Sequence, residues 1–137
     1  MMRRILPIIL LLLLPAFTIE QMGTVQISYF RITEEGNNII VSWQAREESD
    51  VKEYELYRMT RLTNNQFVKI QGIDPHGVDK AYIYRDDQVF KSSSELVDYR
   101  LEVVYLDGVR EQLARDQVNY TSTAIRRTWG SIKAMFQ

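Results

Sequence analysis

The strongest constraint on the fold is a run of residues, Tyr99–Tyr105, in which every second position carries a large apolar side chain. Successive side chains of an extended strand point to opposite faces, so this run places four large residues on one face. They are Tyr99, Leu101, Val103 and Tyr105. The pattern predicts an antiparallel strand with one buried face and one polar face, and it opposes an all-helical fold.

Shorter runs with the same character recur along the chain, separated by turn-forming residues such as Asp107-Gly108. Together they predict seven strands, near residues 24–33, 39–43, 54–58, 67–70, 81–85, 99–105 and 109–120. In the first of them the apolar phase shifts between Tyr29 and Phe30, which indicates a bulge or a switch between sheets. Seven strands without an internal helix favour an all-β sandwich, with a small closed barrel as the alternative.

Three aromatic residues carry a resemblance to a known family. Trp43, Tyr54 and Tyr99 match the core tryptophan, the core tyrosine and the tyrosine corner of the fibronectin type III fold, an immunoglobulin-like sandwich. The resemblance covers the span from about Thr24 to Tyr120. It implies that Trp43 and Tyr99 are structural, with the Tyr99 hydroxyl bonded to the backbone of the preceding corner.

The order of the strand motifs resembles, more closely, fibronectin-like domains of secreted Gram-negative bacterial proteins. The motifs are Trp43, Tyr54–Arg58, Phe67–Ile70, Tyr82–Asp86, Tyr99–Leu101 and Asp107-Gly108. Such domains often precede a C-terminal sorting domain of the type IX secretion pathway. No sorting domain follows in this sequence, so we expect a periplasmic or membrane-associated location.

Residues 1–18 have the pattern of a secretory signal peptide. Arg3 and Arg4 form a basic start, Ile5–Leu14 an apolar run, and Pro15–Thr18 a helix break with small residues near a cleavage point. An uncleaved membrane anchor is the alternative, although the apolar run is shorter than the roughly 20 residues that span a bilayer. We therefore expect an exported protein.

The remaining chain divides into a sandwich over residues 19–120 and a further segment over residues 121–137. Removal of residues 1–18 leaves 15 basic and 18 acidic residues, a net charge of −3. This charge gives no electrostatic case for nucleic-acid binding. Because the sequence contains no cysteine, the sandwich must be stable without disulfides. For the same reason we expect no lipid anchor at the cleavage point.

The sequence offers no catalytic constellation and no cofactor motif. His76 is the only histidine, and it has neither a cysteine nor a second histidine as a partner for a nucleophilic or metal site. Four acidic residues are grouped closely enough to raise the question of calcium: Asp74, Asp79, Asp86 and Asp87. Their spacing matches no calcium loop, which favours a solvated loop surface. We expect no enzyme activity, cofactor or metal.

Residues 121–137 depart from the strand pattern. Apolar residues recur there at helical spacing along one stripe: Ile125, Trp129, Ile132 and Phe136. The basic residues lie off the stripe: Arg126, Arg127 and Lys133. The pattern predicts a basic amphipathic helix that binds a partner protein, with the membrane surface and the chain's own sandwich as alternative docking sites. Gly130 lowers the helix stability by about 1 kcal/mol, so the segment needs a surface to order it.

A weaker candidate site lies on the sandwich itself. Alternation places Tyr57 and Val104 on the outer face, near Arg100 and Glu102, where they would form an exposed patch.

The leading interpretation of the whole sequence is an exported, non-enzymatic module for assembly or adhesion that docks through residues 121–137. The alternative is a carbohydrate-binding module that uses outward tyrosines such as Tyr57 as a sugar platform.

Overall fold

The computed structural model describes residues 22–89, 96–120 and 132–136. Seven strands are present in this part of the chain, which confirms the predicted number. They are β1 (Thr24–Glu35), β2 (Asn38–Ser49), β3 (Val51–Met59), β4 (Val68–Ile73), β5 (Tyr82–Asp86), β6 (Leu96–Tyr105) and β7 (Arg110–Asn119). A 3-10 turn, η1 (Arg61–Thr63), follows β3. The predicted signal peptide at residues 1–18 lies outside the described residues.

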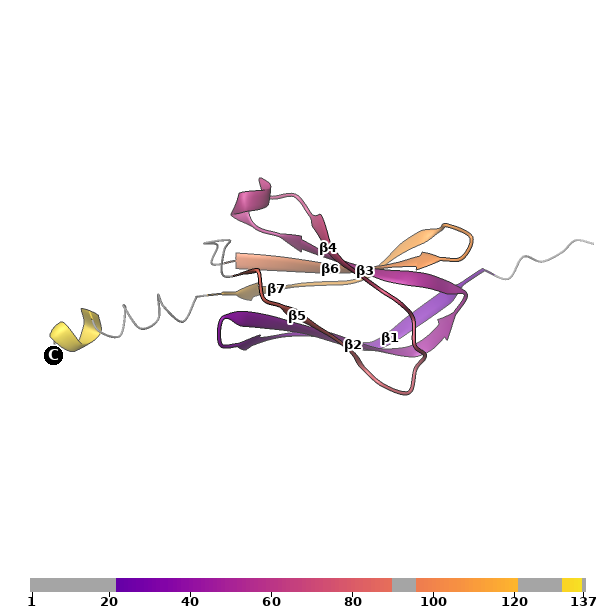
Figure 1. Cartoon of the computed structure of the whole chain (residues 1–137), viewed down its shortest axis with the longest axis horizontal. Coiled ribbons are helices and arrows are strands. Elements are labelled where there is room, and N and C mark those ends of the chain that lie inside the picture. The colour runs from indigo at the N-terminus through magenta and orange to yellow at the C-terminus, as the bar shows by residue number, and fades with distance from the viewer. Residues whose placement is uncertain (1–21, 90–95, 121–131, 137) are drawn as a thin grey trace, which may run out of the picture.

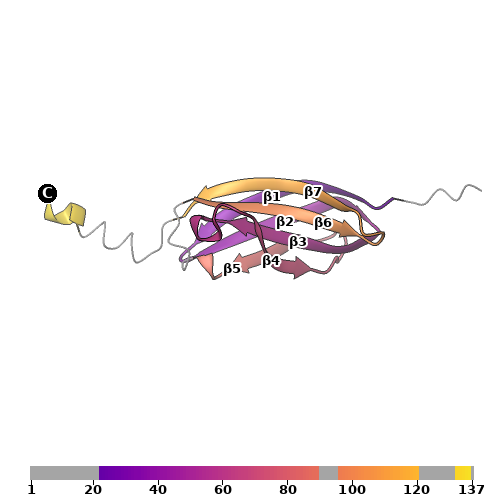
Figure 2. The ribbon, with the colours of Figure 1, turned by 90° about the horizontal axis from the view of Figure 1, so that it is seen from above.

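The strands form two antiparallel sheets that face each other in two layers (Figure 1). One sheet has the order β1-β2-β5 and the other the order β4-β3-β6-β7. Along one side of the sandwich, β7 runs beside β1 of the opposite sheet (Figure 2). The predicted all-β sandwich is therefore the observed architecture, and the barrel alternative is wrong.

The shift of apolar phase in the first strand has a local cause. Strand β1 pairs with β2 along its whole length, and its register is irregular between Gln26 and Ile27 and between Ile27 and Tyr29. A bulge of this kind lets one strand turn a different set of side chains inward without leaving its sheet. The bulge alternative is thus correct, and the switch between sheets is not.

Several strands are longer than predicted, and β3 and β6, for example, begin at Val51 and Leu96. Strand β2 continues to Ser49, well beyond Trp43, and β4 continues to Ile73, into the stretch expected to be a loop. The extension of β2 is rich in polar residues, because it lies where one face of the sheet meets water. The hairpin at Asp107-Gly108 forms as predicted, with Gly108 at a φ of 87°.

The core lies between the two sheets, and the predicted inward residues are buried there. Trp43 is fully buried and stacks on Tyr82, with ring centroids 5.2 Å apart and ring planes 6° apart. Tyr54 meets Trp43 edge-on at 5.8 Å. Stacked and edge-on ring pairs stabilise the fold beyond what the burial of each ring contributes. This aromatic group therefore helps to fix how the two sheets pack.

Tyr99 is fully buried as expected, and its hydroxyl donates a hydrogen bond to Asp86 Oδ2 at 2.7 Å. The predicted bond to the backbone of the preceding corner falls largely on residues 90–95, which lie outside the described residues. Asp86 also accepts two hydrogen bonds from Arg58, at 2.7 and 2.6 Å. The carboxylate belongs to β5 and both donors belong to the other sheet, so the cluster ties the two layers together.

Candidate functional site

The segment predicted to bind a partner is only partly described. Ile125, Arg126, Arg127 and Trp129 lie outside the described residues. Residues 132–135 form a short helical turn, and all side chains from 132 to 136 are exposed. The apolar ones are Ile132 at 39%, Met135 at 81% and Phe136 at 86% exposure.

The described end of this segment makes no contribution to the core. None of the residues from 132 to 136 belongs to the buried cluster that the described residues form between the sheets. Lys133 shares this short stretch with Ile132 and Phe136, so a positive charge lies beside exposed apolar surface. Within the described part of the chain, no helix is both long enough and apolar enough to cross a membrane.

The patch predicted at Tyr57 and Val104 does not form an exposed surface. Tyr57 and Val104 both lie on the outer face of the four-stranded sheet, but Val104 is only 5% exposed and Tyr57 is half-buried. In the strand register Val104 lies between Glu53 and Arg110, whose long side chains flank it on the same face. The prediction of an apolar patch at Val104 is therefore wrong.

Charged side chains dominate this outer face instead. Glu55 is 3% exposed and accepts hydrogen bonds from Arg110, at 2.7 Å, and from the Tyr57 hydroxyl. Burial alone would raise the pKa of Glu55, but these hydrogen bonds outweigh it and bring the pKa down to about 2. Glu55 is thus an anion that Arg110 and Tyr57 hold in place.

Two arginines of the same face pack on aromatic rings. The guanidinium of Arg100 lies 4.7 Å from the ring centroid of Tyr57 and 4.4 Å from that of Phe67. Arg115 lies 4.9 Å from the Phe67 centroid. Because Arg100 covers one face of Tyr57, that face is closed to a sugar ring. Phe67 was predicted only as part of a strand, since its contacts depend on strands that are distant in sequence.

A polar cluster anchors the loop that contains His76. Tyr54 and Tyr82 each donate a hydrogen bond of 2.7 Å to Glu48 Oε2, while Glu48 Oε1 accepts from the backbone N–H of Gly77 at 3.0 Å. The His76 ring stacks on Tyr82 at 3.6 Å. These contacts fix the loop against the sheet, and they give His76 a packing role.

The tyrosines of this cluster should make the folded protein less stable at alkaline pH. Burial raises the pKa of Tyr82 from 10.0 to about 12, with Glu48 adding to the shift and the His76 N–H opposing it, and burial also raises the pKa of Tyr54. Since both folded-state values lie above the unfolded one, the stabilisation is fully present below pH 10 and is lost as pH rises towards 12. We expect the unfolding temperature to fall across that window.

This prediction is checked by thermal unfolding at a series of pH values, followed by circular dichroism. The Tyr82→Phe variant cannot ionise at this position, so its unfolding temperature should fall less steeply with pH than that of the wild type. Identical slopes for the two proteins would contradict the assignment to Tyr82.

The acidic residues considered for calcium are not gathered into one site. Asp86 is 1% exposed and is bound to Arg58 and Tyr99, so the expected solvated loop surface is wrong for this residue. Asp74 and Asp79 are exposed in the loop around His76. Among the described residues no three acidic, histidine or cysteine side chains are placed to hold a metal ion together.

The sequence matches no protein-family profile and no curated protein. The fold is similar to pectate lyase PelI from Erwinia chrysanthemi, solved with tetragalacturonic acid, at 17% identity and a TM-score of 0.52 over 67% of this chain and 28% of that one. OgpA from Akkermansia muciniphila is 14% identical with a TM-score of 0.57, over 75% and 29%.

A Fn3-like protein from Clostridium thermocellum is 16% identical with a TM-score of 0.48, over 73% of this chain and 95% of that one. The chain spans less than a third of the length of PelI and OgpA. At these identities the similarity to those two proteins shows the sandwich fold alone.

Proposed function

We propose that the chain is an exported, non-enzymatic module of fibronectin type III type that acts in assembly or adhesion in the periplasm or at the cell surface. It docks on a partner protein through residues 121–137. The observation that carries this proposal is the exposed apolar end of that segment, above all Phe136 at 86% exposure, which does not belong to the buried core of the described residues. Large exposed apolar side chains of this kind are typical of interaction sites.

The charge of the segment specifies the partner. Residues 121–137 contain three basic residues, Arg126, Arg127 and Lys133, and no acidic residue. We infer an apolar groove with an acidic rim on the partner, because complementary charge speeds encounter and selects the partner. A carbohydrate platform at Tyr57 is less well supported, since Arg100 covers one face of that ring.

The proposal is tested by pull-down from detergent-solubilised envelope with the mature chain as bait. We expect a protein that the wild type retains to be lost from a chain ending at Tyr120 and from the double variant Arg126→Glu, Arg127→Glu. The retained protein is then purified, and direct binding is measured at low and high salt, where a screened interaction weakens.

The matched control reverses two exposed charges of the sandwich, Lys52→Glu and Lys80→Glu, which changes the net charge by the same amount. This control should retain the partner, and all variants should unfold at the wild-type temperature. If the control lost the partner to the same extent, the effect would come from net charge alone and not from residues 121–137. Unfolding of the chain ending at Tyr120 would instead make the segment part of the fold.

A further inference from the structure

The outer face of the four-stranded sheet is hollowed on both sides of Asp98. A depression of about 390 Å³ is lined by Asp98, Arg115, Asp116 and Gln117. A smaller one of about 130 Å³ is lined by Met59, Thr60, Arg61, Asn65, Leu96 and Asp98. Asp98 lines both, so the two depressions lie next to each other on β3, β6 and β7, and we name them together the Asp98 groove.

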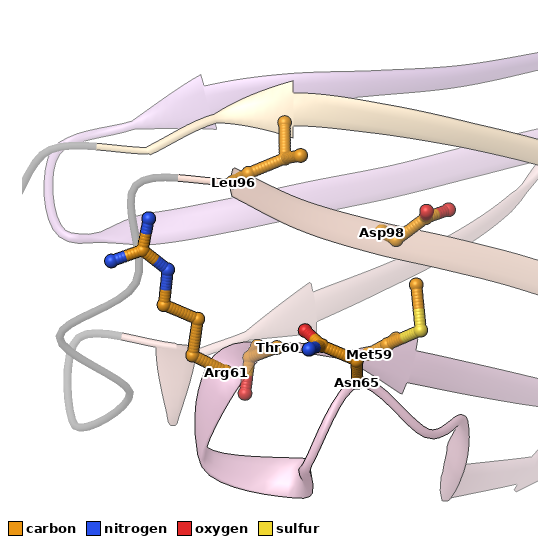
Figure 3. A pocket seen from close by; sticks show the side chains of 6 residues that line it. All are labelled: Met59, Thr60, Arg61, Asn65, Leu96 and Asp98. Carbon is orange, nitrogen blue, oxygen red and sulfur yellow. The ribbon is translucent and has the colours of Figure 1, made fainter.

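The strand register explains why these residues meet. Asp98 pairs with Met59 of β3 on one side and with Gln117 of β7 on the other, so the three side chains form a row across the sheet. The turn around η1 brings Arg61 and Asn65 to one side of the smaller depression, opposite Leu96 and Asp98 of β6 (Figure 3). The groove therefore depends on three separate stretches of the sequence, near residues 59–65, 96–98 and 115–117.

Polar groups in this groove remain available. Arg61, Asn65 and Gln117 are all exposed, and within the described part of the chain their side chains form no hydrogen bond. Asp98 accepts hydrogen bonds from Arg115 at 3.1 and 2.9 Å, and each carboxylate oxygen keeps a further lone pair. The groove thus presents both donors and acceptors.

The floor of the groove is rigid. Asp98 is 5% exposed and is held by the forked contact with Arg115, whose guanidinium lies over the Phe67 ring at 4.9 Å. A bidentate contact of this kind fixes both partners in one plane. Polar groups that are already fixed lose little conformational freedom when a ligand binds, which favours binding through a few hydrogen bonds.

Charge and apolar surface narrow the class of ligand. The acidic residues Asp98 and Asp116 balance the basic residues Arg61 and Arg115, so the groove attracts neither anions nor cations strongly. Leu96, at 48% exposure, adds apolar surface at its edge. Sugar rings combine hydroxyl groups, which both donate and accept, with faces of C–H groups that pack on such surface.

We propose that the Asp98 groove binds a neutral oligosaccharide. Asp98 accepts hydrogen bonds from ring hydroxyls, while Asn65, Gln117 and Arg61 donate to hydroxyl oxygens, and Leu96 packs on a C–H face. None of these residues belongs to residues 121–137, so the two proposals rest on different side chains.

The test is NMR titration of the ¹⁵N-labelled mature chain with three neutral probes, cellopentaose, xylopentaose and chitotetraose, at millimolar concentrations. We expect at least one of them to shift the side-chain amide signals of Asn65 and Gln117 in a saturable way. Tetragalacturonic acid, as an anionic comparison, and an uncharged glycine-serine peptide should shift them less.

Two variants and one control give the residue-level result. Asn65 has a φ of 58°, so Asn65→Gly removes the amide without backbone strain. We expect Asn65→Gly and Gln117→Ala each to weaken binding about five- to tenfold, the effect of one hydrogen bond. Gln112→Ala, on the same exposed strand but two rows away, should bind as the wild type does.

The proposal is overturned if none of the three neutral probes shifts these amides, or if both variants bind as tightly as the wild type. It is equally overturned if the peptide or tetragalacturonic acid binds more tightly than every neutral sugar. Loss of the partner protein from the pull-down would leave these sugar shifts unchanged, so the two proposals fail separately.

Discussion

Replacement of Trp43 by alanine is expected to lower the free energy of unfolding by about 3 to 5 kcal/mol. Trp43 is fully buried between the sheets, stacked on Tyr82 and in edge contact with Tyr54, so alanine would leave a cavity among rings that cannot close it. A small domain has a total stability of about 5 to 15 kcal/mol, so this is a large part of it. Urea unfolding followed by circular dichroism measures the change.

The control is Trp43→Phe. The indole Nε1 of Trp43 is buried and has no hydrogen-bond partner within the described structure. A buried unpaired donor costs about 1 to 3 kcal/mol, and phenylalanine removes that donor together with part of the ring. The phenylalanine variant should therefore lose well under half as much stability as the alanine variant. Similar losses for both would show that the site tolerates no smaller ring, and an alanine loss below about 1 kcal/mol would contradict the packing.

The sequence predicts the strands and the core well because both depend on a local pattern. The alternation from Tyr99 to Tyr105 needs only a strand with one buried face, and all four of its inward residues are buried. Trp43 was assigned to the core by its match to the core tryptophan of the fibronectin type III fold, and it is fully buried as well. Buried positions of a strand require apolar residues, so the alternation of apolar and polar residues in the sequence shows which side chains face the core.

Burial on the outer face was not predictable from alternation. The pattern correctly placed Val104 and Glu55 on the outer side, yet both are almost fully buried there. Their exposure is set by long neighbours on adjacent strands, such as Arg110 beside both of them. That information lies in the register between strands, which the sequence of a single strand does not contain.

The Asp98 groove was missed for the same reason. Asp98 looks like one polar residue of an alternating strand, and Arg115 lies 17 positions away in the sequence. A sequence signal does exist at Asn65, where two consecutive asparagines follow η1 and both adopt positive φ angles. That signal indicates a tight turn, but it does not show that the turn stands beside Asp98.

The fold resemblance predicted the buried position of Tyr99 but not its contact with the opposite sheet. The hydroxyl donates to the Asp86 carboxylate of that sheet. Asp86 was considered only as a loop residue, because the sequence does not show that β5 ends opposite β3 and β6. The ion pair with Arg58 follows from that meeting of the sheets.

The second large effect is expected at this buried cluster. Asp86→Ala should lower the free energy of unfolding by about 3 to 5 kcal/mol, because it leaves the partly buried Arg58 guanidinium without its counter-charge. It also removes the acceptor of the Tyr99 hydroxyl and of the Gln88 backbone N–H. Urea unfolding compares the variant with the wild type and with Arg58→Met.

The double variant Arg58→Met, Asp86→Ala separates the cost of an unpaired charge from the value of the ion pair. Arg58→Met alone leaves the Asp86 carboxylate, at 1% exposure, with two neutral donors among the described residues, the Tyr99 hydroxyl and the Gln88 backbone N–H. Because the double variant contains neither charge, it should lose clearly less stability than the sum of the two single losses. Additive losses would mean that Arg58 and Asp86 act independently, and the two sheets would then be held together at this edge by Tyr99 and the apolar core.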